Sequence, residues 1–305
     1  MHNSCRPFCG PGRLDPVDKT ARALGDESRA CGRRRRGSAS AARLTGGLLA
    51  CLIWIGAAGA QTAVDLELVI AVDVSLSMDL DEQRLQREGY VAAFRDGQVQ
   101  KAISAGALGR IAVTYMEWAG QHWQNTIIPW TVIDSPQAAR AFADRLEAQP
   151  ISRERWTSIS SALQFARKLL DGSNAKSARR VVDVSGDGPN NAGPPVLAVR
   201  AALLAEGIVI NGLPIMLKSG APGFFDLADL DRYYANCVIG GPGAFMVPVK
   251  HVAELKEAIR RKLLLEISGL AAAPDVVPTQ AVPEPSYDCM VGERQWQWYL
   301  DRGPN

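Results

Sequence analysis

The stretch VIAVDVSLSMDL, residues 69–80, decides the fold, because an apolar run passes directly into three alternating oxygen-bearing side chains. Residues 69–72 are typical of a strand that is covered on both faces, since such strands are continuously apolar. Asp73, Ser75 and Ser77 follow at every second position. In an open α/β sheet the functional crevice lies at the carboxyl ends of the parallel strands. We therefore expect these three side chains to line a site at that edge.

Strand-like and helix-like segments alternate along the rest of the chain. The predicted strands cover residues 64–73, 109–119, 125–133, 179–186, 207–215 and 244–249. The predicted helices cover residues 79–96, 135–148, 158–171, 194–205 and 251–267. The two strands between residues 109 and 133 are close enough in sequence to form an antiparallel hairpin. This order predicts a doubly wound, mostly parallel α/β sheet of the Rossmann-like kind, with one antiparallel edge strand and helices on both faces.

Composition and charge indicate a folded globular protein without a nucleic-acid surface. The 305 residues are 47% hydrophobic and 22% charged, enough apolar mass for one sizeable core. The formal net charge is +2, but residues 1–60 hold ten of the Lys and Arg and only four of the Asp and Glu. The remainder carries 24 basic and 28 acidic residues, a formal charge of −4. Nucleic-acid binding requires clustered basic residues on the folded part, so this class is disfavoured.

The N-terminal segment has the features of a secretory signal. Arginines at 33–36 and 43 precede the apolar run of residues 44–60, which is too short to span a bilayer comfortably. Its last residues are small, so we expect cleavage after Ala60 and a periplasmic or extracellular product. A lipoprotein-like box ending at Cys51 and a start codon downstream of Met1 remain alternatives, and the export route stays open. We predict three regions: an extension with signal peptide over 1–60, a domain over 61–269, and a Pro-rich linker with tail over 270–305.

The six cysteines divide at the predicted cleavage site. Four precede it, at positions 5, 9, 31 and 51, and only Cys237 and Cys289 follow. In an oxidising compartment an even pair favours a disulfide, which here would tie the C-terminal tail to the domain. Two unpaired buried thiols are the alternative.

Two more oxygen-bearing residues are expected at the same edge of the sheet. Thr157 stands just before a predicted helix, and Asp187 follows a predicted strand. Together with Asp73, Ser75 and Ser77 they form a set of carboxylates and hydroxyls without His or Cys, which suits Mg²⁺ or Mn²⁺. Hydroxyls are weak ligands and leave a cation strongly electrophilic. A carboxylate from another protein can then complete its coordination.

This arrangement resembles the von Willebrand factor type A domain and its metal-ion-dependent adhesion site. The Asp-x-Ser-x-Ser motif matches at Asp73, Ser75 and Ser77, and the family's Thr and later Asp match Thr157 and Asp187. The resemblance covers residues 64–267, and its final part is LADLDRYYANCVIGGPGAFMVPVKHVAELKEAI. SGDGPNN and NCVIGGPGAF look like a bacterial branch catalogued as a domain of unknown function.

Two positions depart from the family pattern. Leu76 stands where many members have Gly, which predicts a stiffer loop or one partly covered by the leucine. The later motif reads SGDG instead of the common Thr-Asp-Gly, so that Gly186 precedes Asp187. Neither departure removes a predicted ligand.

The resemblance implies a cation-dependent protein-binding module whose partner supplies an Asp or Glu carboxylate. One alternative is a structural domain in which the metal serves stability only, and a strand-end turn whose side chains cap the next helix needs no metal at all. A metal-assisted hydrolase is less favoured. The sequence has only His2, His122 and His251 and no recognisable nucleophile elbow, so we predict no enzyme activity.

Two other motifs have plain interpretations. GGPGAF, residues 240–245, reads as a tight turn, because it lacks the Lys and Ser or Thr of a phosphate-binding loop. The aromatic residues near the end of the chain, Trp296, Trp298 and Tyr299, indicate either a docking surface or a tail that folds back on its own domain.

Overall fold

A computed structural model describes residues 61–217, 226–269, 277–278 and 287–302. Their main sheet has seven strands in the order β4-β3-β2-β6-β7-β8-β9, and β1 and β5 pair separately. The strands are β1 (Thr62–Ala63), β2 (Glu67–Asp73), β3 (Ile111–Trp118), β4 (Gln124–Ile133), β5 (Ala175–Lys176), β6 (Arg180–Gly186), β7 (Val209–Pro214), β8 (Phe245–Met246) and β9 (Val277–Pro278). The predicted signal segment and most of the Pro-rich stretch lie outside the described residues.

The strand that carries the motif lies inside the sheet. β2 pairs in parallel with β3 on one side and with β6 on the other. All seven of its residues are buried, which explains why its sequence is apolar rather than alternating. The predicted hairpin is present, with β4 antiparallel to β3 at one edge. The two-residue β9 is also antiparallel, at the opposite edge, where no strand was predicted.

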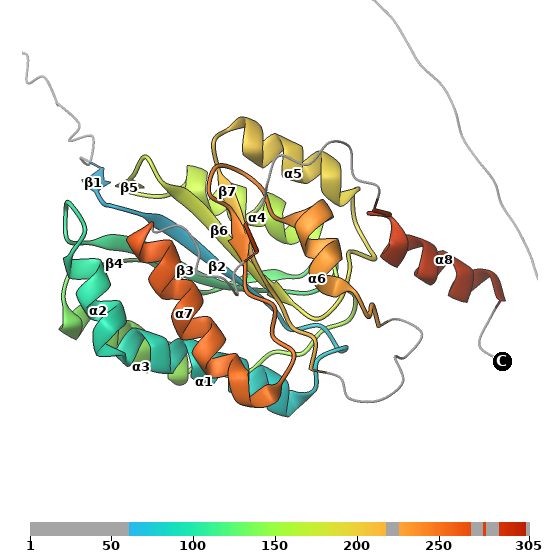
Figure 1. Cartoon of the computed structure of the whole chain (residues 1–305), viewed down its shortest axis with the longest axis horizontal. Coiled ribbons are helices and arrows are strands. Elements are labelled where there is room, and N and C mark those ends of the chain that lie inside the picture. Colours follow the sequence, from blue (N-terminus) through green and yellow to red (C-terminus); the bar gives the residue numbers. More distant parts are fainter. Residues whose placement is uncertain (1–60, 218–225, 270–276, 279–286, 303–305) are drawn as a thin grey trace, which may run out of the picture. The chain divides into compact units, whose positions relative to one another are not determined.

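Helices cover both faces of the sheet (Figure 1). They are α1 (Leu80–Arg95), α2 (Gly97–Ser104), α3 (Pro136–Glu147), α4 (Ile159–Asp171), α5 (Val196–Ala205), α6 (Leu230–Tyr233), α7 (Leu255–Ser268) and α8 (Val291–Arg302). A π-helix (Tyr234–Val238) continues α6, and a short 3₁₀ turn (Val252–Glu254) precedes α7.

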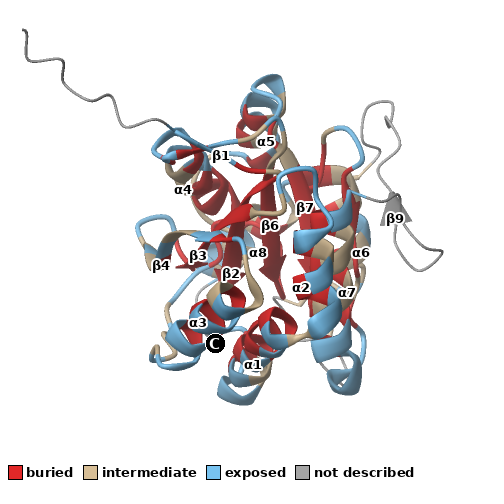
Figure 2. Ribbon diagram, turned by 90° about the vertical axis from the view of Figure 1, so that its left-hand side faces the viewer, coloured by how far each residue is buried: buried red, intermediate tan, exposed pale blue. Residues whose placement is uncertain are grey.

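Alternate residues of β2 enter two separate cores. Ile70 and Val72 pack with residues of α1, α3 and α7, whereas Val69 and Ala71 pack with residues of α4, α5 and α6. Figure 2 shows the buried strands between these two helical layers. The doubly wound α/β architecture predicted from the sequence is therefore confirmed.

The helix that follows the motif begins at a capping box. The side chain of Asp79 accepts hydrogen bonds from the backbone of Asp81 and Glu82, and Glu82 accepts one from the backbone of Asp79. Such reciprocal capping fixes the start of a helix. Because Asp79 performs this role, Asp73, Ser75 and Ser77 are not needed as caps of α1.

Some elements differ from the prediction. β8 covers only two of the expected residues 244–249. α2 was not predicted; it follows α1 directly, because Asp96 is both the last cap of α1 and the first cap of α2. Residues 291–302, where the sequence showed no clear periodicity, form α8. GGPGAF contains the expected turn, with φ of 100° at Gly241 and 73° at Gly243. Within the described ranges, no helix has the length and apolarity to cross a membrane.

Candidate metal-binding site

Four of the five predicted ligands form one chain of hydrogen bonds at the carboxyl edge of the sheet. Oδ1 of Asp73 accepts the backbone N–H of Ser75 at 2.7 Å. The hydroxyl oxygens of Ser75 and Ser77 are 2.7 Å apart, and Ser77 donates to Oδ1 of Asp187 at 2.6 Å. Ser77 is exposed, whereas Asp73, Ser75 and Asp187 are buried. The strand ends thus bring the four side chains together and leave an opening to solvent at Ser77.

Thr157 lies against the loop that follows Asp187. Its backbone N–H donates to the side chain of Asn191 at 2.9 Å, and its carbonyl accepts the backbone N–H of Asn191 at 2.8 Å. Its hydroxyl is 3.9 Å from the point that a Cβ on Gly188 would occupy. The fifth predicted ligand therefore sits beside the residue next to Asp187.

The electrostatics of Asp73 fit a bound cation. Burial raises the pKa of Asp73 well above its ordinary value, the charge of Asp187 raises it further, and hydrogen bonds from Ser75 and from the backbone of Asp187 oppose the shift. Oδ2 of Asp73 is buried and accepts no hydrogen bond of ordinary geometry from the residues that the structure describes. Buried polar atoms nearly always have a partner. A divalent cation between the carboxylates would offset both the burial and the repulsion.

The donor set also decides which cations fit. In the described part of the chain no three His, Cys, Asp or Glu side chains are grouped so that they could hold a metal. The candidate site has two carboxylates and three hydroxyls instead, all oxygen donors, which suits Mg²⁺ or Mn²⁺ better than soft metals.

Comparisons with known proteins place the fold and the family. A family model described as "Protein of unknown function (DUF1194)" matches residues 63–271. The chain belongs to the DUF1194 family. By sequence, no curated protein matches it.

Solved structures resemble this DUF1194 chain in fold. Proximal thread matrix protein 1 from the mussel byssus, described with a zinc-occupied MIDAS motif, is 11% identical with a TM-score of 0.51. The pilus adhesin SpaC from Lactobacillus rhamnosus GG is also 11% identical, with a TM-score of 0.52. Each match covers 68% of this chain, but only 49% of the byssus protein and 31% of the adhesin. These likenesses show the fold alone, which is the von Willebrand factor type A fold that the motif order predicted.

Leu76, in the loop after β2 of this DUF1194 domain, is 44% exposed, whereas its neighbours Ser75 and Asp73 are buried. The loop is held by backbone contacts, because Val74 bonds to both Trp118 and Glu154.

Sequence reasoning missed several residues that position the ligand loops. Asn190 accepts the N–H of Ser160 at the start of α4, and its own N–H donates to the hydroxyl of Tyr233. Trp156 has a φ of 73°, a backbone conformation that is rare for a bulky residue. The sequence shows the Asn-Asn pair of SGDGPNN, but its position in the chain does not indicate which residues these side chains contact.

The C-terminal helix packs on the same loops. Cys237 and Cys289 are joined by a disulfide, with Cα atoms 5.5 Å apart, just before α8 begins. Glu293 of α8 accepts a hydrogen bond from the side-chain amide of Asn190 at 2.7 Å. The rings of Trp296 and Trp156 are 4.2 Å apart. The sequence left open whether the aromatic tail forms a docking surface or folds back on the domain. Trp296 folds back on the domain, because it packs on Trp156.

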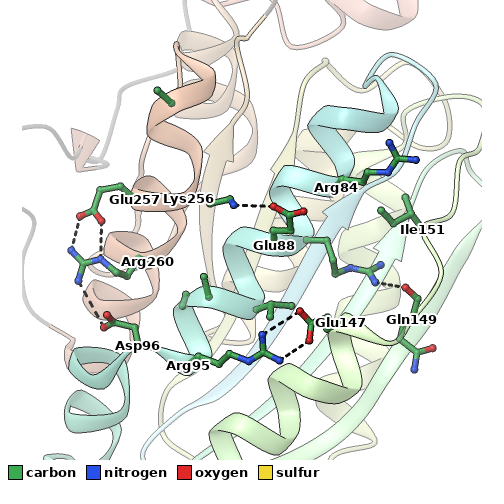
Figure 3. Close-up of a pocket in the computed structure, with 15 residues that line it drawn as sticks. Arg84, Glu88, Arg95, Asp96, Glu147, Gln149, Ile151, Lys256, Glu257 and Arg260 are labelled. Carbon is green, nitrogen blue, oxygen red and sulfur yellow. Dashed lines mark hydrogen bonds and ion pairs between the residues drawn. The ribbon is translucent and has the colours of Figure 1, made fainter.

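A groove lies between α1, α3 and α7, on another side of the domain. It has a volume of about 820 Å³, and Figure 3 shows the charged side chains that line it. Lys256 pairs with Glu88 at 2.8 Å and Arg95 with Glu147 at 2.6 Å. Arg260 pairs with Glu257 at 2.5 Å. These charges already pair with one another, two of the pairs between helices and one within α7, so the groove is a weaker candidate for ligand binding than the candidate metal site.

Burial also keeps Tyr234, close to the candidate metal site, in its protonated form. It raises the pKa of Tyr234 well above its ordinary value, and the charge of Asp73 adds to that shift. The phenol therefore stays protonated at physiological pH and remains a hydrogen-bond donor.

Proposed function

We propose that this chain is an exported, divalent-cation-dependent protein-binding module of the adhesion type. Asp73, Ser75, Ser77, Thr157 and Asp187 would hold Mg²⁺ or Mn²⁺, and an Asp or Glu of a partner protein would complete the coordination. When bound, the cation supplies a positive charge that attracts a carboxylate. The observation that carries the proposal is the hydrogen-bonded chain from Asp73 to Asp187, which passes through the exposed residue Ser77.

The ligand chemistry favours binding over a purely structural metal. Three of the five donors are neutral hydroxyls, so the site neutralises less of a cation's charge than a site saturated with carboxylates would. One of the two structural neighbours is a pilus adhesin, and the other is described with a zinc-occupied MIDAS motif, which supports the same kind of role here. The proposal assigns a binding role and no catalytic residue.

The surface beside Ser77 restricts the carboxylates that fit. A hollow of about 550 Å³ borders Ser77 and is lined by Asp79, Asp81 and Glu82 together with apolar side chains. These acidic side chains repel a uniformly acidic segment. We therefore expect the partner to present a single carboxylate with basic or apolar neighbours.

A peptide library tests the proposal. Peptides with one central Asp are passed over the immobilised domain with Mg²⁺ or with chelator, and a matched library with central Asn serves as the control. We expect Mg²⁺-dependent retention of the Asp peptides alone, with enrichment of basic and apolar neighbours. The variant Asp73→Ala should retain none, whereas Asp144→Ala removes an exposed charge on α3, outside both the ligand set and the hollow, and should retain them.

One outcome would favour the structural alternative. If chelation lowers the melting temperature of the natural protein but neither library is retained, the metal serves stability only.

The exported location is part of the proposal and has its own test. The described residues include the disulfide between Cys237 and Cys289, which suits an oxidising compartment. Mass spectrometry of protein recovered outside the cytoplasm should find an N-terminus at Gln61. An intact segment before Gln61 would contradict processing at Ala60.

A further inference from the structure

The ring of Tyr234 occupies a slot between two glycines of neighbouring strands. A Cβ on Gly212 of β7 would lie 2.7 Å from Cδ1 of Tyr234. A Cβ on Gly186, the last residue of β6, would lie 3.1 Å from the tyrosine hydroxyl. Real Cβ contacts this short are rare, so a larger residue at either position would displace the ring. The chain thus has glycine at both places where the tyrosine needs room.

The hydroxyl of Tyr234 and the outer oxygen of Asp73 face the same small space. The point 3.1 Å from the hydroxyl is only 2.8 Å from Oδ2 of Asp73. Both residues are 0% exposed, and neither oxygen makes a hydrogen bond of ordinary geometry with the residues described. A donor and an acceptor, both buried and without a hydrogen bond of ordinary geometry, therefore lie close to the one point that a Cβ on Gly186 would occupy. Such pairs in a native protein need an explanation.

This geometry also explains a departure from the family pattern. Gly186 stands at the position before the later Asp, where the resembling domains commonly have Thr. A threonine there would place its Cβ against Oδ2 of Asp73 and the hydroxyl of Tyr234. With glycine at position 186, the threonine hydroxyl is absent and the hydroxyl of Tyr234 has room beside Asp73.

The backbone around Tyr234 is fixed by two features. Tyr234 begins the π-helix, and the carbonyl of Tyr234 accepts the backbone N–H of Ile239 at 3.0 Å. π-Helical turns are uncommon and occur frequently at functional sites. Cys237, in the same turn, is linked to Cys289 by the disulfide. The segment that carries Tyr234 is therefore tied to the C-terminal part of the chain.

We propose that Tyr234 is a positioning residue of the cation site: its hydroxyl donates to Oδ2 of Asp73 when a cation is bound, across the space that Gly186 leaves open. This inference rests on the proposed function, because it assigns a role toward the same cation. Carboxylates that bind metals are usually oriented by hydrogen bonds from a second layer of residues, whose loss costs roughly 10-fold to 100-fold in metal affinity.

The variant Tyr234→Phe tests the inference, because it keeps the ring in the slot and removes only the hydroxyl. Mn²⁺ affinity is measured by calorimetry on the full domain, and the melting temperature is measured in chelator. We expect affinity to fall about 10-fold or more. The melting temperature without metal should stay unchanged or rise, since a buried hydroxyl without a partner is removed. Tyr90→Phe, which alters another buried phenol close to a carboxylate, should leave Mn²⁺ affinity unchanged.

The outcomes separate this inference from the proposed function. If the natural protein binds Mn²⁺ and Tyr234→Phe binds it equally well, the role of Tyr234 is wrong and the metal site stands. If Tyr234→Phe also melts at a lower temperature in chelator, the hydroxyl has a structural role and the inference is overturned. If the natural protein binds no Mn²⁺, the proposed function itself fails.

Discussion

The hydroxyl of Ser77 donates a 2.6 Å hydrogen bond to Oδ1 of Asp187, which lies 110 residues further along the chain. This bond joins the loop after β2 to the loop after β6, two neighbouring strands of the sheet. Both oxygens are predicted ligands of one cation. The same contact therefore stabilises the metal-free site and identifies the place where a cation would bind.

Replacing Ser77 by alanine removes this contact and one predicted ligand together. We expect Mn²⁺ affinity to fall at least 10-fold and the metal-free protein to lose about 1 kcal/mol of stability, since the bond is charge-assisted but Ser77 is exposed. Calorimetry and urea unfolding measure the two effects. Ser104→Ala, at the end of α2, serves as a control that removes a hydroxyl away from the site. An affinity equal to that of the natural protein would remove Ser77 from the ligand set.

Gly292 allows α8 to approach the loop that carries Asp187. A Cβ on Gly292 would lie 2.2 Å from the backbone oxygen of Asn190, so Gly292→Ala forces the helix and loop apart. We expect a loss of about 1 to 3 kcal/mol and faster hydrogen exchange at residues 187–192. Gly97→Ala is the matched control, because no atom lies within 4 Å of its added Cβ. Unchanged exchange in Gly292→Ala would show that α8 does not support the loop.

The disulfide should contribute strongly to stability. Cys237 and Cys289 are 52 residues apart, for which loop-closure entropy predicts about 4 kcal/mol. Without reductant, neither cysteine should react with an alkylating reagent. The variant carrying both Cys237→Ser and Cys289→Ser should unfold at a lower urea concentration. Alkylation of both thiols in the folded, unreduced protein would contradict the pairing.

Glu266 should make stability depend on pH. Burial raises its pKa to about 7, the charge of Asp183 adds to the shift, and Lys262 opposes it. The folded pKa lies above the ordinary value of 4.5, so the folded state binds a proton that the unfolded state releases. This contribution is complete below pH 4.5 and is lost as the pH rises through 7.

Urea unfolding in chelator at several pH values tests this prediction. The difference between pH 4.5 and pH 8 should be on the order of 3 kcal/mol from this group, and Glu266→Gln should remove it. Glu88→Gln, which alters an exposed carboxylate, should keep the dependence. If the natural protein and Glu266→Gln show the same pH dependence, Glu266 is not the group responsible.

The sequence was sufficient for the fold and for the approximate place of the site, because both depend on local patterns. β2 is apolar throughout and ends at Asp73, so one short stretch indicates a buried strand and the edge at which its polar residues lie. Thr157 and Asp187 could be assigned there because they flank predicted elements of the same sheet. The ligand roles of these residues remain predictions.

The rest could not be predicted, because it depends on contacts between distant segments. The contact of Trp156 with Trp296 follows from the position of α8, a helix that was not predicted from the sequence. The closeness of Tyr234 to Asp73 requires the glycine slot in β6 and β7, which no spacing rule reveals.

Calorimetric titration of the metal-free protein with Mn²⁺ tests the central claim most directly, comparing the natural protein with Asp73→Ala and with the control Asp81→Ala. Asp73 is a buried predicted ligand of the candidate site, whereas the side chain of Asp81 is 90% exposed and pairs with Arg84. We predict one saturable Mn²⁺ site in the natural protein and in Asp81→Ala, and none in Asp73→Ala. An unchanged Mn²⁺ affinity in a folded Asp73→Ala variant would contradict the account.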